Sequence, residues 1–197
     1  MLQEAIMEYD NRKYQGNPKV VDRWKLFMML EKSFAEAEKY VLKGTESNKK
    51  NLELLVDRVY SNQYKQVIFQ AAKEFESLAK EMAGLPPDKI VPIEDVAKKI
   101  VLLHPYIGET VVDNNYVSRT PLSGWARRDG GSYSLAWWSS YYKLKNGAEI
   151  DFKYATLGLC LDAIGAVYIL NLFNIKNAFG NLAMAKDATH FRVGIKD

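Results

Sequence analysis

The stretch 155–173, ATLGLCLDAIGAVYILNLF, decides how the rest of the chain must be arranged. It holds one charged residue, Asp162, and is nearly long enough to span a bilayer. Three features oppose a membrane span. Asp162 would cost about 2.5–3.5 kcal/mol near the middle of an inserted helix, Asn171 adds polarity, and no cluster of charges flanks the stretch. We therefore expect a helix buried on nearly all sides, and no membrane span.

Small residues recur along this stretch and would let other backbones approach it closely: Ala155, Gly158, Ala163, Gly165 and Ala166. A chain of 22.5 kDa has difficulty covering such an apolar helix completely. Association with another subunit is the simplest remedy, so a homo- or hetero-oligomer is expected.

Asp162 is costly in apolar surroundings unless a charged or hydrogen-bonding partner meets it. We expect the partner to be Arg127, Arg128 or Lys176, within the chain or across an interface. A proton-carrying role for Asp162 is the alternative.

The sequence before this stretch has the spacing of helices. Apolar residues recur at helical intervals from Pro18, after the N-cap candidate Asn17, to Gly44. Further helices are expected over 45–59, over 64–82, where apolar residues alternate at intervals of four and three, and over 92–103, ended by His104-Pro105. We expect an antiparallel helical bundle in region 1–104.

Region 105–197 lacks the helical spacing of the first region until the apolar stretch. It is expected either to form a second unit or to be integrated with the bundle in one domain. Residues 109–131 are rich in β-branched residues and turn formers, which predicts short strands and irregular loop. The helix is expected to break near Gly180, and residues 189–195, THFRVGI, read as a final strand.

Apolar and charged residues alternate on both sides of Asn146-Gly147. This period of two predicts a β-hairpin closed by Lys145-Asn146-Gly147, with Gly147 left-handed. Trp137 and Trp138 would then point to opposite faces, and one of them would need cover from another subunit or a later segment. The alternative is a helix over 132–145, which propensity disfavours by only tenths of a kcal/mol per residue.

Composition indicates a folded protein with 48% hydrophobic residues and a net charge of only +3. The lone cysteine, Cys160, excludes an intramolecular disulfide, and one cysteine with two histidines cannot form a zinc site without carboxylates or a second chain. No cofactor or metal is therefore expected. Residues 1–14 lack the apolar run of a secretory signal, so we expect an intracellular protein, or a virion component if the chain is viral.

No catalytic motif stands out in the sequence. Gly130-Gly131 beside Arg127-Arg128 lacks the order of a phosphate-binding loop and reads as a turn. The two imidazoles, His104 and His190, have carboxylates nearby in sequence. An enzyme with a site around His104, Glu109 and Arg127 is therefore an alternative. We expect His104 to end its helix, where a cation complements the terminal carbonyls.

Basic and aromatic residues interleave in two places, near 9–25 and near 119–133. This mixture suits nucleic acid, because cations hold phosphates while rings stack on bases. The candidate nucleic-acid contacts are Arg12, Lys13, Tyr14, Lys19, Arg23, Lys25, Arg119, Arg127 and Arg128. The candidate subunit contacts are Trp137, Trp138, Tyr141, Tyr142, Gly158 and Gly165.

These patterns predict an α+β fold, mainly α, in which a helical bundle precedes a short β-hairpin or small sheet and a long buried apolar helix. The expected function is that of a non-enzymatic subunit. It would self-associate and pack around nucleic acid without sequence specificity, as a virion coat or ribonucleoprotein subunit does. The alternatives are a protein-binding regulatory module without nucleic acid, and the enzyme described above.

Overall fold

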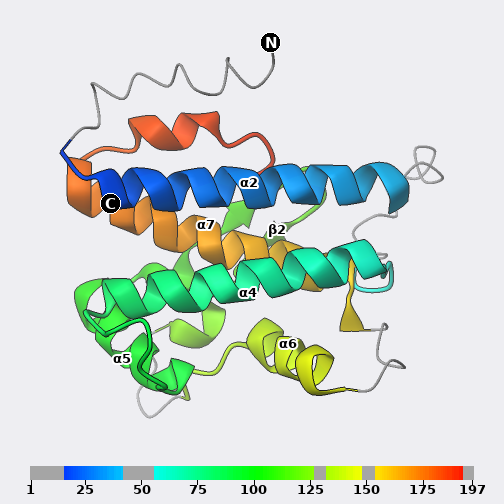
Figure 1. The fold of residues 1–197 in the computed structure, drawn as a ribbon, viewed down its shortest axis with the longest axis horizontal. Coiled ribbons are helices and arrows are strands. Elements are labelled where there is room, and N and C mark those ends of the chain that lie inside the picture. Colours follow the sequence, from blue (N-terminus) through cyan, green and yellow to red (C-terminus); the bar gives the residue numbers. More distant parts are fainter. Residues whose placement is uncertain (1–15, 42–55, 127–131, 148–153, 193–197) are drawn as a thin grey trace.

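The computed structural model describes residues 16–41, 56–126, 132–147 and 154–192 (Figure 1). Helices dominate these ranges, and the sheet found within them is an antiparallel pair of short strands. The fold class expected from the sequence, α+β and mainly α with a long buried apolar helix, is therefore confirmed.

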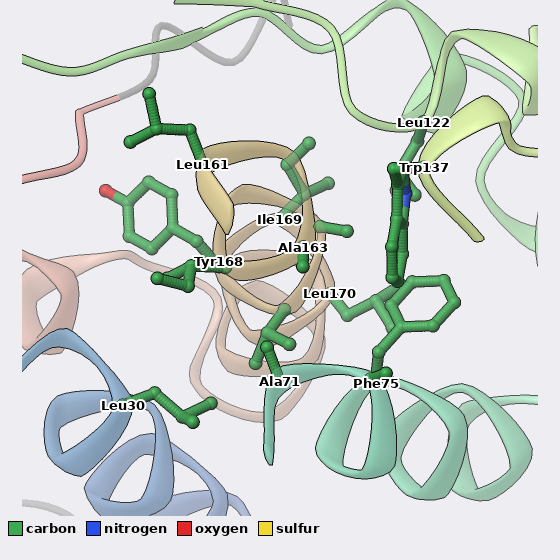
Figure 2. Close-up of a cluster of buried hydrophobic side chains, with 14 of the residues drawn as sticks. Leu30, Ala71, Phe75, Leu122, Trp137, Leu161, Ala163, Tyr168, Ile169 and Leu170 are labelled. Atoms are coloured by element: carbon green, nitrogen blue, oxygen red, sulfur yellow. The ribbon is translucent and has the colours of Figure 1, made fainter. Parts of the chain in front are cut away.

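The apolar helix α7, Leu157–Phe179, lies at the centre of the core. It begins at Thr156, whose hydroxyl accepts a hydrogen bond from the Leu159 amide at 3.1 Å. It ends at Gly180, whose φ of 70° is left-handed, so the break predicted there is confirmed. Figure 2 looks along α7 and shows its buried side chains, among them Leu161, Tyr168 and Leu170, leaving the helix on different sides.

Two long helices pack on α7: α2, Pro18–Val41, and α4, Asn62–Met82. They run antiparallel to each other across the molecule (Figure 1), which confirms two helices of the predicted bundle. Trp24 and Phe27 of α2 have ring centroids 4.9 Å apart, and Phe27 lies 5.2 Å from Tyr168 of α7. Aromatic packing thus fixes α2 onto α7. The helix expected over 45–59 lies mostly outside the described residues, and 56–58 form a turn.

A cluster of aromatic side chains joins α4 and α6, Ala136–Asn146, beside α7. The Phe75 ring of α4 lies 5.5 Å from Trp125 of the 3-10 helix η4, Ser123–Trp125, 5.0 Å from Trp137 and 5.5 Å from Trp138. Figure 2 shows Phe75 and Trp137 next to Leu170 of α7. Residues from both sides of position 104 therefore contribute to one core.

Shorter elements complete the fold. Helix α5, Ile93–Leu103, packs on α4 and ends at His104 as predicted. It is followed by the 3-10 helix η3, Ile107–Glu109. Strands β1, Val112–Asp113, and β2, Ser118–Arg119, form the small antiparallel sheet, which confirms short strands in this region.

After α7, the chain passes through the 3-10 helix η6, Ala183–Asp187, beside α2 (Figure 1). Arg192 then exchanges two backbone hydrogen bonds with Asp113, at 2.8 and 2.9 Å. Within the described residues, the predicted final strand is limited to this one bridge.

The hairpin predicted around Lys145-Asn146-Gly147 is wrong in its first arm. Residues Ala136–Asn146 are helical, and the φ of Gly147 is −77°, which is not left-handed. The buried residues of α6 follow the spacing 137, 138, 141 and 144, which places both tryptophans on one side of a helix. Burial of these large rings outweighs the small disadvantage in helix propensity. Residues 148–153, which would have formed the second arm, lie outside the described residues.

The chain itself covers most of α7, so this helix does not by itself require a second subunit, and association with another subunit stays a prediction. This helix is long and apolar enough to cross a membrane, but its 18-residue apolar window is 83% buried within the protein. The close approaches expected at two glycines are intramolecular. A Cβ atom on Gly158 would lie 1.9 Å from Oδ1 of Asp57, and one on Gly165 would lie 2.9 Å from Cγ of Pro121.

The partner of Asp162 is Arg119, rather than the expected Arg127, Arg128 or Lys176. Arg119 Nε donates to Oδ1 at 2.7 Å and Nη2 donates to Oδ2 at 2.8 Å, a bidentate contact between β2 and α7. Burial raises the pKa of Asp162 more than Arg119 lowers it, and the hydrogen bonds to Asp162 raise the pKa of Arg119. The pair therefore acts as a largely buried structural ion pair.

Candidate functional site

Two members of the first predicted basic and aromatic group, Arg23 and Trp24, are used inside the fold. Arg23 Nη1 lies 2.9 Å from Oε1 of Glu74, and Nη2 lies 2.8 Å from Oε2 of Glu81, so this guanidinium ties α2 to α4. Trp24 is buried. Lys19 and Lys25 are exposed, and Lys25 lies 3.5 Å from Asp22. Arg12, Lys13 and Tyr14 lie outside the described residues.

Two members of the second predicted group, Arg119 and Trp125, are likewise used inside the fold. Arg119 binds Asp162, as described above, and its Nη1 lies 3.5 Å from Oδ1 of Asp57. Trp125 is fully buried against Phe75. Arg127 and Arg128 lie outside the described residues, so their predicted role stays a prediction.

The predicted subunit contacts divide sharply in exposure. Trp137 and Trp138 are 3% and 5% exposed, and Tyr141 is buried beside them. Their cover comes from the chain, as does that of Gly158 and Gly165. Tyr142 is different, because 46% of its surface is exposed. It remains the one member of that set on the surface.

The exposed end of α6 carries a basic and aromatic surface that the sequence analysis did not assign. Lys145 Nζ lies 5.9 Å from the ring centroids of both Tyr141 and Tyr142, within the range of cation–π contacts. Lys143 Nζ lies 5.6 Å from the ring of Tyr154. Lys143 and Lys145 are exposed, and among the described residues neither forms an ion pair with a carboxylate.

The first part of α4 continues this surface. The ring of Phe69 lies 5.7 Å from that of Tyr141, with an interplanar angle of 79°, and Lys65 Nζ lies 5.7 Å from the Phe69 ring. Lys65, Phe69 and Lys73 are spaced by four residues and therefore share one stripe of the helix. We call the following set the lysine–tyrosine face: Lys65, Phe69, Lys73, Tyr141, Tyr142, Lys143 and Lys145.

Among the described residues of α6 and the first part of α4, the charged side chains of this face are lysines. Helix α6 contains two lysines and no acid, and α4 has no acid before Glu74. Exposed cations beside exposed aromatic carbon can hold an anion while offering a ring surface for stacking. The sequence signal was the run SSYYKLKN, residues 139–146. Interpreted as a strand, this run divides its side chains between two faces, which hid the surface.

His104, the imidazole of the alternative enzyme site, packs on α7. Its Nε2 lies 3.1 Å from Nδ2 of Asn177, so Nε2 accepts that hydrogen bond, and its ring lies 5.0 Å from that of Phe173. Burial lowers the pKa of His104, which favours the neutral ring. His104 therefore ends α5 as predicted, and its burial disfavours the cation that was expected there.

Two further features bear on the alternatives. Leu102, Leu103 and Tyr106 are exposed at the end of α5, where a protein-binding module would offer apolar contacts. Within the described ranges, no group of three or more histidine, cysteine, aspartate or glutamate side chains is arranged to hold a metal ion.

Comparisons with protein-family models, with curated proteins and with solved structures found no match.

Proposed function

We propose that this protein is a non-enzymatic binder of single-stranded nucleic acid, and that it contacts the strand through the lysine–tyrosine face without reading its sequence. One observation carries the proposal. The end of α6 exposes Tyr142, Lys143 and Lys145 together, with no acid on the helix. Lysine ammonium groups would contact phosphates, which all strands share.

The exposed tyrosine favours a single strand over a duplex. Tyr142 presents a ring that a base can stack on, and the bases of a duplex are already stacked on one another. Phe69 and Tyr141 hold α6 against α4, so the ring is offered from a rigid support. A rigid aromatic side chain loses little conformational entropy when a base binds.

Self-association is not part of this proposal, because the chain supplies the cover that α7 needs. We expect light scattering of the protein freed of nucleic acid to give the monomer mass of 22.5 kDa. A mass of two or more subunits that persists in high salt would instead support the self-associating subunit expected from the sequence. A mass that rises only with added oligonucleotide would place the self-association on the strand.

The proposal is tested by fluorescence anisotropy with labelled single-stranded DNA, single-stranded RNA and duplex DNA. We expect single strands to bind more tightly than the duplex, with affinity falling as salt rises from 50 to 200 mM. Lys143→Gln with Lys145→Gln should reduce the slope of log affinity against log salt by about 0.7 for each phosphate that the variant no longer neutralises. Tyr142→Ala should weaken binding by about 5- to 150-fold, the range for removing one stacked base.

The matched control removes two lysines elsewhere. Lys39 and Lys98 are exposed and lie 2.6 and 2.7 Å from Glu36 and Asp95. Lys39→Gln with Lys98→Gln also replaces two lysines, so it changes the net charge by the same amount. We expect this control to bind like the wild type. Equal weakening in both double variants would show that only net charge matters. Weakening confined to Arg127→Gln with Arg128→Gln would place the binding site on that predicted pair instead.

A further inference from the structure

His190 lies between two glutamates of α2, in a cluster that the proposed function does not use. His190 Nδ1 lies 3.7 Å from Oε1 of Glu31, and Nε2 lies 3.6 Å from Oε2 of Glu38. Glu31 and Glu38 are two turns apart on α2, so they share one face of the helix. Both ring nitrogens therefore face a carboxylate, which leaves neither of them free for a substrate.

The same glutamates hold the backbone around the ring. Oε1 of Glu31, which is 2% exposed, accepts hydrogen bonds from the amides of Thr189 at 2.9 Å and His190 at 2.7 Å. Oε1 of Glu38 accepts a short hydrogen bond of 2.5 Å from the Tyr116 hydroxyl, in the β1–β2 loop. The cluster thus ties both the C-terminal segment and the β1–β2 loop to α2.

We propose that His190, Glu31 and Glu38 form a pH-dependent clasp, which holds residues 189–192 on α2 while the imidazole is charged and loosens them when it loses its proton. An imidazolium has two N–H groups and can meet both carboxylates, whereas a neutral ring has one. The Thr189 hydroxyl, 2.8 Å from Nδ1, can satisfy the other nitrogen of a neutral ring. It cannot replace the positive charge between the two glutamates.

The surroundings define the pH range of the clasp. Interaction with Glu31 outweighs burial and raises the pKa of His190 above 6.5. Burial opposes ionisation of Glu31, but its contacts with His190 and Thr189 outweigh burial and lower its pKa below 4.5. The His190 contribution is complete below its unfolded pKa and is lost as pH rises through the folded value. The Glu31 contribution is lost as pH falls through its own lowered value.

Other titratable or charged groups lie around the two glutamates. Burial raises the pKa of Glu38 despite the Tyr116 hydrogen bond, so Glu38 ionises later than Glu31. Four further titratable groups lie near Glu38 and Glu31: Tyr64 of α4, Cys160 and Tyr168 of α7, and Tyr116. Burial raises the pKa of each of them, so all four stay neutral near pH 7. Arg192 is the other cation of the segment and acts on Tyr168. Among these groups, His190 has the ordinary pKa that lies nearest neutral pH, so we expect the clasp to follow its titration.

The clasp makes a prediction that nuclear magnetic resonance can check, because the protein has two histidines. We expect one imidazole to titrate above 6.5 and the other, His104, to titrate below it. The variants His190→Gln and His104→Gln assign the two signals. Glu38→Gln should lower the His190 midpoint, since it removes one of the two carboxylates that face the ring. A His190 midpoint at or below 6.5 would overturn the proposal.

Hydrogen exchange tests whether the segment responds. We expect the protection factors of the Thr189 and His190 amides, both bound to Glu31, to fall severalfold between pH 6 and pH 8.5 after correction for intrinsic rates. His104→Gln should keep this fall and His190→Gln should abolish it. Equal protection at both pH values in the wild type, while His190 titrates, would show that the ring does not control the segment. The wild-type measurements stand even if His190→Gln does not fold.

Discussion

Replacing Phe75 with alanine is expected to lower the free energy of unfolding by about 3–5 kcal/mol, the range for deleting a large aromatic side chain from a core. Phe75 is fully buried, and its ring lies within 5.5 Å of those of Trp125, Trp137 and Trp138. These tryptophans belong to η4 and α6, so the cavity would open where both elements meet α4. The three rigid indole rings cannot all move in to fill it, because Trp125 is held by η4 while Trp137 and Trp138 are held by α6.

Urea unfolding followed by far-ultraviolet circular dichroism measures this loss without relying on the tryptophans themselves. The midpoint should fall by about 2 M if the urea dependence is about 2 kcal/mol per M. Met29→Ala is the control, because Met29 is a large apolar residue with 64% of its surface exposed. We expect that change to stay within about 0.5 kcal/mol. A loss below about 1 kcal/mol in Phe75→Ala would mean that α6 is not anchored by this cluster.

Much of the helical architecture follows from sequence because periodicity and end signals agree there. The spacing of apolar residues predicts α2, α4 and α7, and the Pro18 and Gly180 end signals agree with the start of α2 and the end of α7. His104-Pro105 ends α5 for the same local reason. In these segments each short-range preference supports the tertiary packing, which is the condition under which sequence patterns are reliable.

Helix α6 shows where this agreement fails. Its sequence satisfies a period of two by parity, and its aromatic and serine content disfavours a helix slightly. The same residues also satisfy a helical spacing that gathers Trp137, Trp138, Tyr141 and Leu144 on one face. Only the tertiary site beside Phe75 decides between these periods, and that site is built from distant residues.

The lysine–tyrosine face could not be predicted from the sequence for a related reason. Sequence indicates that arginines such as Arg23 and Arg119 are basic, but it does not say which carboxylates they will meet. Glu74 and Glu81 are more than 50 positions from Arg23, and Asp162 is 43 positions from Arg119. Folding turns these two cations into structural links. The lysines of α6 stay exposed, and no described carboxylate pairs with them.

Replacing Arg119 with methionine is expected to lower the free energy of unfolding by about 3 kcal/mol at pH 7, the lower end of the range for breaking a buried ion pair. The variant would leave Asp162, a residue of the apolar helix α7, as an unpaired charge. The effect should lie at the lower end, because 19% of the Asp162 side chain is exposed and water can solvate part of it. Asp57, the other carboxylate near Arg119, is 70% exposed and needs no partner.

The double variant Arg119→Met with Asp162→Leu separates charge from packing. Removing both partners of a buried pair is often neutral or stabilising, so most of the lost stability should return. Acid should also help the single variant. Without Arg119, burial acts unopposed and raises the pKa of Asp162 further, so the deficit shrinks as pH falls through that value and the carboxyl gains a proton. Urea midpoints at pH 7 and pH 5 test both points. A double variant as unstable as the single one, with no recovery in acid, would show that Arg119 acts through its packed stem and not through its charge.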